Sequence, residues 1–250
     1  MRKFGLIGFP LGHSFSQKYF TGKFLKEGIT DTVYENFPID CIDKFPELIL
    51  KEKELCGLNV TIPYKTEVIR FLDYLDPEAK EIGSVNVIVI RRGGDKPFLS
   101  GYNSDIKGIT DSVIPFINKG IRKALVLGSG GSSNAVKYTL SKLGVEVTII
   151  SRNPQPGQRS YSDISRVLLD STDLIVNTTP LGMYPDTGSK PPLNYSFLGE
   201  KHILFDLVYN PEMTAFLKMG QERGCKIVTG LDMLYSQAER SWEIWNDPAN

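Results

Sequence analysis

The chain has 250 residues, 41% apolar and 23% charged, which is enough for two modest domains with proper cores. Its 29 Lys and Arg residues balance its 29 Asp and Glu residues, which excludes a global field that would attract nucleic acid or an anionic membrane. Three cysteines form no complete disulfide framework or metal-type cluster, and we find no secretory signal or membrane-spanning apolar run. These features predict a cytoplasmic protein without nucleic-acid, membrane or metal partners.

The first hundred residues alternate predicted strands and helices. An apolar strand over residues 4–8 is followed by a Gly/Pro loop and by a predicted helix over 17–28, where apolar residues recur at helical spacing. Strands that alternate with helices at this interval are typical of a parallel sheet. Residues 85–92 and 97–102 depart from this alternation. A Gly93-Gly94-Asp95 turn between them predicts a strand followed directly by a return strand. The remaining predictions here are strands over 32–37 and 57–61 and helices over 45–53 and 66–72.

A second α/β unit follows a predicted helix over 105–119. It opens with the most apolar strand of the chain, 124–127, and a glycine-rich loop. We expect further strands over 145–150, 174–177, 203–206 and 227–228, and helices over 134–143, 162–169, 213–223 and 233–245.

The glycine-rich loop predicts a dinucleotide site. A strand, Gly128-x-Gly130-x-x-Ser133, a helix and a strand follow one another, an order that aims backbone N–H groups and a helix N-terminus at a pyrophosphate. Glycine-rich turns also serve tight packing alone, so the loop is weak evidence by itself. The loop residues predicted to contact the cofactor are Gly128, Gly130, Gly131, Ser132 and Ser133.

The next strand favours NADP over NAD. It ends in Ser151, Arg152 and Asn153 with no carboxylate to hold a ribose 2′-hydroxyl, and the permanently charged fork of Arg152 suits a 2′-phosphate. The alternative is a solvated surface arginine. The other predicted cofactor contacts are Thr178, Met183, Leu207, Gly230 and Met233; for Thr178 and Met183 the alternative is simple loop packing.

Polar side chains at strand ends of the N-terminal part predict the substrate site. Amides, hydroxyls, one lysine and one aspartate are what a polyol carboxylate needs. Alternatives are that Ser16 caps a helix and that Asn59 and Asn86 only satisfy strand-end backbone groups. The residues are Ser14, Ser16, Asn59, Thr61, Lys65, Asn86, Asn103 and Asp105.

Over nearly the whole chain the sequence resembles the shikimate dehydrogenase family. It departs from the common pattern at Gln17 (often Pro), Ser104 (often Thr) and around Arg152 (often Asn-Arg-Thr). The matching motifs, besides the glycine-rich loop, are His13-Ser14-x-Ser16, Asn59-Val60-Thr61-x-Pro63-x-Lys65, Gly83-x-Val85-Asn86, Gly101-x-Asn103-Ser104-Asp105-x-x-Gly108, Asn177-Thr178-Thr179-Pro180-x-Gly182-Met183, Asp206-x-x-Tyr209 and Gly230-x-x-Met233-Leu234-x-x-Gln237-Ala238.

The resemblance implies an α/β fold of two domains: an N-terminal α/β substrate domain, residues 1–103 completed by 231–250, and a Rossmann-type NADP-binding domain, 104–230. It implies NADPH-dependent, reversible reduction of 3-dehydroshikimate to shikimate in aromatic amino-acid (chorismate) biosynthesis. A monomer and a homodimer both fit the sequence. Ser14 and Ser16 would bind the substrate carboxylate, and Lys65 and Asp105 would flank the reacting carbon. Asn59, Thr61, Asn86, Asp105, Tyr209 and Gln237 would surround the ring and its hydroxyls.

Lys65 is the candidate for the chemistry, because reduction of a ketone builds negative charge on its oxygen and needs a cation or proton donor there. Asp105 would orient it. The alternative for the pair is an ordinary surface ion pair, and for Tyr209 and Gln237 it is packing. Two rival functions remain: a quinate or dual-specificity dehydrogenase, against which Arg152 and Ser14 argue, and a non-catalytic NADP(H)-binding sensor, against which Lys65 and Asp105 argue.

Overall fold

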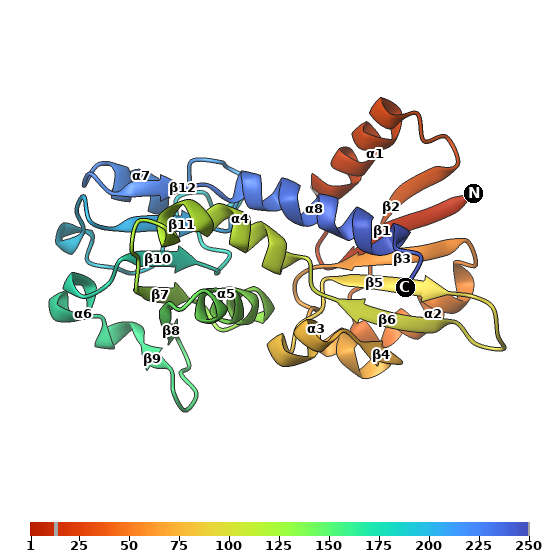
Figure 1. Cartoon of the computed structure of the whole chain (residues 1–250), viewed down its shortest axis with the longest axis horizontal. Coiled ribbons are helices and arrows are strands. Elements are labelled where there is room, and N and C mark those ends of the chain that lie inside the picture. The colour runs from red at the N-terminus through yellow and green to blue at the C-terminus, as the bar shows by residue number, and fades with distance from the viewer. Residues whose placement is uncertain (13–14, 250) are drawn as a thin grey trace. The chain divides into compact units, whose positions relative to one another are not determined.

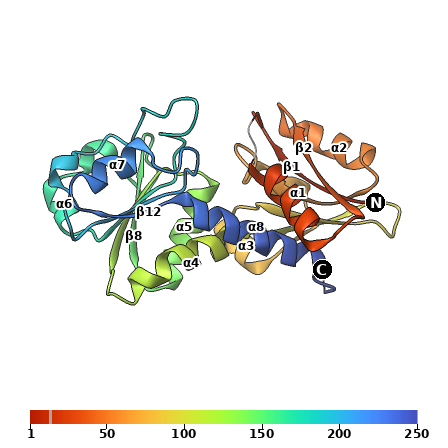
Figure 2. The ribbon, with the colours of Figure 1, turned by 90° about the horizontal axis from the view of Figure 1, so that it is seen from above.

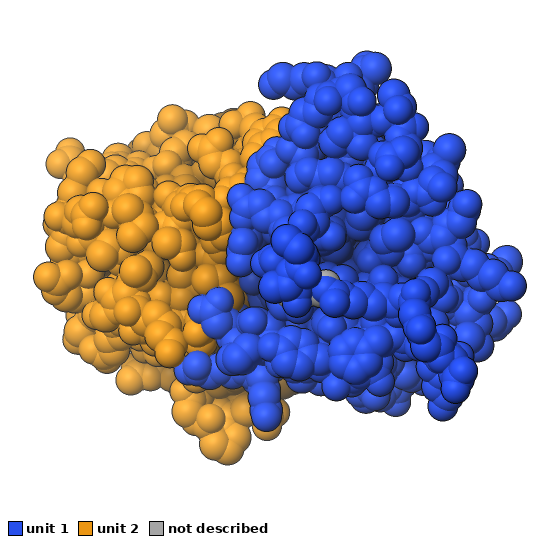
Figure 3. Space-filling model, turned by 45° about the vertical axis from the view of Figure 1, so that its right-hand side comes forward, with its two compact units in different colours: residues 1–104, 238–250 blue, residues 105–237 orange. Residues whose placement is uncertain are grey.

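The computed structural model describes residues 1–12 and 15–249, so the predicted ligand Ser14 lies outside the described residues. The chain forms two compact units, coloured separately in Figure 3. Unit 1 is Met1–Ser104 with Ala238–Asn250, and unit 2 is Asp105–Gln237. The last helix, α8 (Gly230–Asn246), begins in unit 2 and continues in unit 1.

Unit 1 is built on a mixed sheet with the strand order β2-β1-β3-β5-β6-β4. Its first three strands pair in parallel, as their alternation with helices predicts, and β5 and β6 form the predicted antiparallel hairpin. The strands are β1 (Arg2–Gly8), β2 (Thr32–Pro38), β3 (Leu55–Val60), β4 (Tyr74–Leu75), β5 (Val87–Arg91) and β6 (Phe98–Tyr102).

Helices cover both faces of this sheet (Figure 1). One face packs against α1 (Phe15–Glu27) and the end of α8, and the other against α2 (Phe45–Lys51), η1 (Ile42–Lys44), η2 (Glu67–Phe71) and α3 (Pro77–Ile82). The predicted helix over 66–72 is a 3₁₀ helix instead. Helix α3 was not predicted, although Asp76 caps its first turn by accepting from Glu78 N and Ala79 N.

Unit 2 contains an all-parallel sheet with the strand order β12-β11-β10-β7-β8-β9. The order reverses between β7 and β10, which is the topological switch point of a doubly wound sheet. This order confirms the predicted Rossmann-type fold. The strands are β7 (Lys123–Leu127), β8 (Glu146–Ser151), β9 (Arg159–Ser160), β10 (Leu174–Asn177), β11 (Ile203–Asp206) and β12 (Lys226–Val228).

Figure 2 shows α6 (Arg166–Asp170) and α7 (Ala215–Gln221) on one side of this sheet and α4 (Asp105–Ile117) and α5 (Gly131–Lys142) on the other. The short helix η4 (Tyr195–Phe197) packs with α6 and α7. The prediction of one helix over 162–169 is wrong. A capping box between Ser160 and Asp163 encloses η3 (Tyr161–Asp163), and Ser165 starts α6 by accepting from Leu168 N.

Among the described residues, no helix has the length and apolar character needed to cross a membrane.

Candidate active site

The loop between β7 and α5 has the backbone geometry of an anion site. Gly128 has a φ of +114°, and a Cβ there would lie 2.6 Å from Thr178 Oγ1, so glycine is required. Gly130 precedes α5, and a Cβ at Gly130 would meet no heavy atom within 4 Å. The N-terminus of α5 is therefore open to a close-approaching ligand, which suits a pyrophosphate.

Ser133 replaces the third glycine of the usual pattern without disturbing this loop. Its side chain is buried, and its hydroxyl donates to the Gly128 carbonyl at 2.8 Å. The serine thus closes the loop on itself. The residues present fit a dinucleotide in this respect.

The end of β8 carries the residues predicted to select NADP. Ser151 is buried and its Oγ lies 3.1 Å from Ser129 Oγ, while Asn153 N donates to the same Ser151 oxygen at 3.2 Å. These bonds tie the end of β8 to the glycine-rich loop. Arg152 between them is exposed, and its charge acts on the half-buried Tyr161, where it opposes the rise in pKa that burial causes.

Asn177 and Asp206 hold the loop that follows β10. They pair in register on neighbouring strands, and Asn177 Nδ2 donates to Asp206 Oδ1 at 2.9 Å. Asn177 Oδ1 in turn accepts from Thr179 N at 3.1 Å and from Thr179 Oγ1 at 2.6 Å. The structure therefore fixes the start of the loop that carries Thr178 and Met183. Neither Asn177 nor Asp206 was predicted as a site residue, although a polar residue that ends an apolar strand is a usable signal.

The other predicted cofactor contacts gather near the end of β11. Leu207 N donates to Asn177 O at 3.0 Å. A Cβ at Gly230 would lie 2.7 Å from Leu207 O, so the start of α8 packs directly on this backbone. Met233 is buried one turn further along α8, where its carbonyl packs on Gly108.

The residues of unit 2 that the resemblance assigns to the substrate are Asp105, Tyr209 and Gln237. Asp105 is buried at the start of α4, and Tyr209 and Gln237 are half-buried. Gln237 Nε2 donates to Leu234 O at 3.1 Å within α8. Their roles stay predictions.

In unit 1, the loops after β1 and β3 meet the segment before β5 at one edge of the sheet. Thr61 N donates to Ile7 O at 2.9 Å, and Val85 N donates to the carbonyl of Lys65 at 2.8 Å. A Cβ at Gly8 would lie 2.4 Å from Thr61 Cγ2, so only glycine lets the two loops approach this closely. The half-buried Lys65 thus lies on a loop anchored at this edge.

Ser16, Asn59 and Asn86 lie around the same edge. Helix α1 begins at Phe15, so Ser16 is inside its first turn, which contradicts the capping alternative. Asn59 and Asn86 are buried and both bond backbone groups: Asn59 Nδ2 donates to Asn86 O at 3.2 Å, and Asn86 Oδ1 accepts from Ser104 N at 2.7 Å. The two amides therefore have a structural role whatever they do for a substrate.

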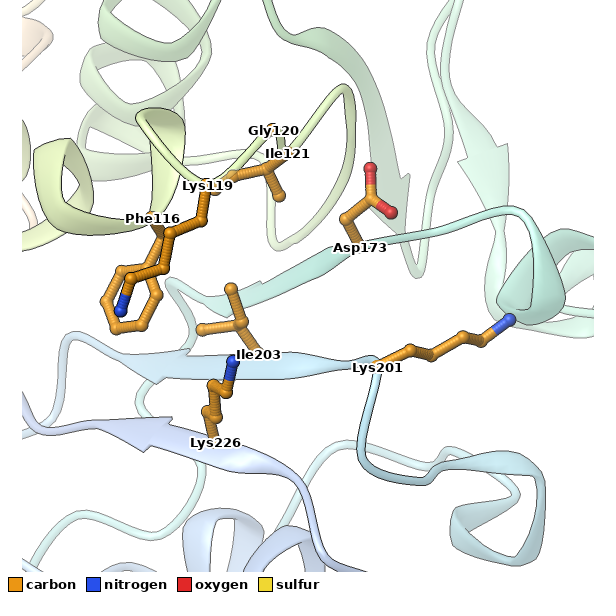
Figure 4. Close-up of a pocket in the computed structure, with 8 residues that line it drawn as sticks. All are labelled: Phe116, Lys119, Gly120, Ile121, Asp173, Lys201, Ile203 and Lys226. Carbon is orange, nitrogen blue, oxygen red and sulfur yellow. The ribbon is translucent and has the colours of Figure 1, made fainter.

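Unit 2 also has a small pocket, of about 130 Å³, at the amino ends of its strands (Figure 4). Three lysines and Asp173 line it. Asp173 Oδ2 accepts from Arg122 N and Lys123 N at 2.8 and 2.9 Å. Lys201 Nζ lies 3.7 Å from Asp170 Oδ1. The glycine-rich loop follows the carboxyl end of β7, so this pocket is at the opposite edge from the predicted nucleotide site.

Residues 6–88 match the family model of the shikimate dehydrogenase substrate-binding domain. Shikimate dehydrogenase (NADP(+)) of Caldanaerobacter subterraneus subsp. tengcongensis is 34% identical over 97% of this chain and 90% of its own length. That of Methanococcus vannielii is 36% identical over 96% of this chain and 90% of its own length.

Solved structures agree with these relatives. A Thermus thermophilus shikimate 5-dehydrogenase in complex with NADP(H) and shikimate matches with a TM-score of 0.83 and 30% identity, over 98% of this chain and 94% of that one. Quinate dehydrogenase from Corynebacterium glutamicum in complex with NAD matches with the same TM-score at 25% identity, over 98% and 93% of the two chains. The resemblance inferred from the motifs is confirmed, and the chain belongs to the shikimate dehydrogenase family.

Proposed function

We propose that the protein is a cytoplasmic NADP-dependent shikimate dehydrogenase, which reversibly reduces 3-dehydroshikimate to shikimate in aromatic amino-acid biosynthesis. The observation that carries the proposal is the end of β8, where the exposed, permanently charged Arg152 stands in place of a carboxylate in a chain of this family. The open N-terminus of α5 supports the same cofactor.

When bound, NADPH supplies the hydride. The backbone N–H groups of Gly130, Gly131 and Ser132 would hold its pyrophosphate at the N-terminus of α5, and Arg152 would pair with its 2′-phosphate. Thr178, Met183 and Leu207 would contact its ribose and nicotinamide, from backbone that Asn177 and Asp206 hold in place.

Unit 1 provides most of the groups that recognise the substrate. Ser14 and Ser16 bind the carboxylate, and a short polar set surrounds the ring hydroxyls. A site built to hydrogen-bond hydroxyls rejects analogues that lack them, because its own buried polar groups would be left unpaired. The set is Asn59, Thr61 and Asn86 of unit 1 and Tyr209 and Gln237 of unit 2.

Lys65 acts at the reacting oxygen. Reduction of the ketone at C3 builds negative charge on that oxygen, and the Lys65 ammonium stabilises it or passes it a proton. The Asp105 carboxylate hydrogen-bonds the same hydroxyl and orients the lysine. In the oxidative direction the proton that the hydroxyl loses passes to the Asp105 carboxylate or to Lys65 in its neutral amine form.

Absorbance at the NADPH band tests the proposal, with purified protein and each pairing of shikimate or quinate with NADP⁺ or NAD⁺. Fast reduction of NADP⁺ by shikimate alone is the expected result. Turnover of quinate with NAD⁺ would assign the chain to the quinate enzymes instead, and no turnover in any pairing would make it a binding protein. Sedimentation of the same sample separates a monomer from a homodimer.

A further inference from the structure

Tyr34 and Ser241, which the sequence motifs do not include, lie in a hydrogen-bonded chain of polar side chains in unit 1. The Tyr34 hydroxyl on β2 donates to Asn59 Oδ1 at 2.8 Å and shares a hydrogen bond with the Ser16 hydroxyl. Asn59 Nδ2 donates to Ser241 Oγ on α8 at 3.0 Å. One arm of the chain therefore runs from α1 through two strands to the last helix.

The second arm runs from Ser241 to another predicted substrate residue. Ser241 Oγ lies 3.0 Å from Ser104 Oγ, and Ser104 Oγ accepts from Asn86 Nδ2 at 3.0 Å. Ser241 and Ser104 are 0% exposed, so water does not compete for these bonds. Ser241 is thus the link between the amides of Asn59 and Asn86.

Backbone groups determine which way each amide points. The Asn86 carbonyl can only accept, so the group of Asn59 that faces it is Nδ2; the Ser104 N–H can only donate, so the group of Asn86 that faces it is Oδ1. The hydroxyls of Tyr34 and Ser241 occupy positions that match this orientation. Burial raises the pKa of Tyr34 above its usual value, so its hydroxyl keeps the proton that it donates to Asn59.

We propose that Tyr34 and Ser241 are positioning residues of the substrate site, which hold Asn59, Asn86 and Ser16 in the orientation that binds shikimate. The inference rests on the proposed function. Removing either hydroxyl deprives a buried amide of one hydrogen bond, and the amide then turns or shifts to replace it. The predicted cofactor contacts belong to unit 2, whereas all six residues of this hydrogen-bonded chain belong to unit 1. These six are Ser16, Tyr34, Asn59, Asn86, Ser104 and Ser241.

Ser241→Ala, Tyr34→Phe and the double variant test this role. Tyr34→Phe removes only the hydroxyl and keeps the ring, which stacks on Phe20 with 4.6 Å between the ring centroids. We expect each single change to raise KM for shikimate by about 5- to 10-fold, the effect of one buried hydrogen bond, with KM for NADP⁺ within about twofold of wild type. KM for shikimate in the double variant should be only slightly above that of the more affected single variant, because one break already interrupts the chain of hydrogen bonds.

Ser236→Ala is the matched control. Ser236 is a serine of the same helix whose hydroxyl bonds Asp111, outside the chain of hydrogen bonds, so its loss should leave both KM values unchanged. Ser241→Cys, whose side chain has the same shape but is slightly larger and forms weaker hydrogen bonds, is measured in parallel in case the alanine variant does not fold, and should also raise KM for shikimate.

Calorimetric titration with shikimate gives a Kd that does not depend on turnover, so failure of the proposed function and failure of this inference are distinguishable. A wild type that binds shikimate without turning it over refutes only the proposed function. The inference is overturned if the variants melt at lower temperature with unchanged affinity for shikimate, if KM for NADP⁺ rises as much as KM for shikimate, or if the two single effects multiply in the double variant.

Discussion

The carboxylate of Asp206 accepts a hydrogen bond from the Thr214 hydroxyl, with 2.6 Å between Oδ2 and Oγ1, and neither residue is exposed to solvent. Thr214 also caps α7 by accepting from Leu217 N, so the end of β11 is tied to the start of α7. The other carboxylate oxygen accepts from Asn177 and from Val208 N. One buried carboxylate thereby joins β10, β11 and α7.

Asp206→Asn should change how stability depends on pH. Burial raises the pKa of Asp206 to about 6, against about 4 in an unfolded chain. Below pH 4 the carboxyl is protonated in both the folded and the unfolded protein. As the pH rises from 4 to 6, the unfolded chain loses this proton while the folded protein keeps it. The free energy of unfolding therefore falls by up to about 3 kcal/mol. Urea denaturation of wild type and variant from pH 4 to 8 measures the difference.

The asparagine fits the same partners, since Thr214 Oγ1 can accept from its amide, and it does not titrate. The difference in unfolding free energy between wild type and variant should therefore change between pH 4 and 6 and stay level above pH 7. Parallel curves over the whole range would mean that Asp206 titrates as in the unfolded chain. Thr214→Ser, which keeps the hydroxyl, serves as the control.

Lys65→Ala should lower kcat by roughly 100-fold or more and leave KM nearly unchanged, because the ammonium acts on charge that develops during the reaction. Steady-state kinetics with shikimate and NADP⁺ measure both constants. Lys65→Arg separates the two roles, since arginine keeps the charge but does not give up a proton. A sharp rise in KM with kcat intact would make Lys65 a binding residue only.

Arg152→Ala should weaken binding of NADPH by about 10- to 100-fold, the size of a lost charged hydrogen bond to phosphate, and weaken NADH far less. Fluorescence titration with the two nucleotides measures this difference. Arg223→Ala, which removes an exposed arginine in the turn after α7, should affect neither. Equal weakening of NADPH and NADH by Arg152→Ala would contradict the 2′-phosphate assignment.

Gly57→Ala should destabilise the protein by about 1–3 kcal/mol. The added Cβ would lie 2.4 Å from Nε1 of Trp245, whose indole N–H donates to Ile88 O at 3.0 Å in the core of unit 1. Gly22→Ala is the matched substitution, because Gly22 lies in α1 with no heavy atom within 4 Å of its Cβ position, and it should stabilise by about 0.5–1 kcal/mol. Thermal unfolding gives the change in Tm of each variant relative to wild type. Equal changes in Tm for the two variants would refute the steric argument.

Local sequence signals predicted most of the fold. The predicted bounds of β10 and β11 agree with the structure, since each strand is a short apolar run between polar residues. The errors fall where structure is short and local capping decides it: α3 has six residues, and the break between η3 and α6 depends on the Ser160 and Ser165 side chains.

The sequence by itself determined the fold class, the family, the glycine-rich loop at β7 and the arginine at the end of β8, because each depends on residues close together in the chain. Only the tertiary structure decided that Ser241 accepts from Asn59, which lies 182 positions earlier, and that Asp206 joins Asn177 to Thr214. No local pattern marks such pairs. A buried polar group needs a partner, and which partner it meets depends on how strands and helices distant in sequence pack together.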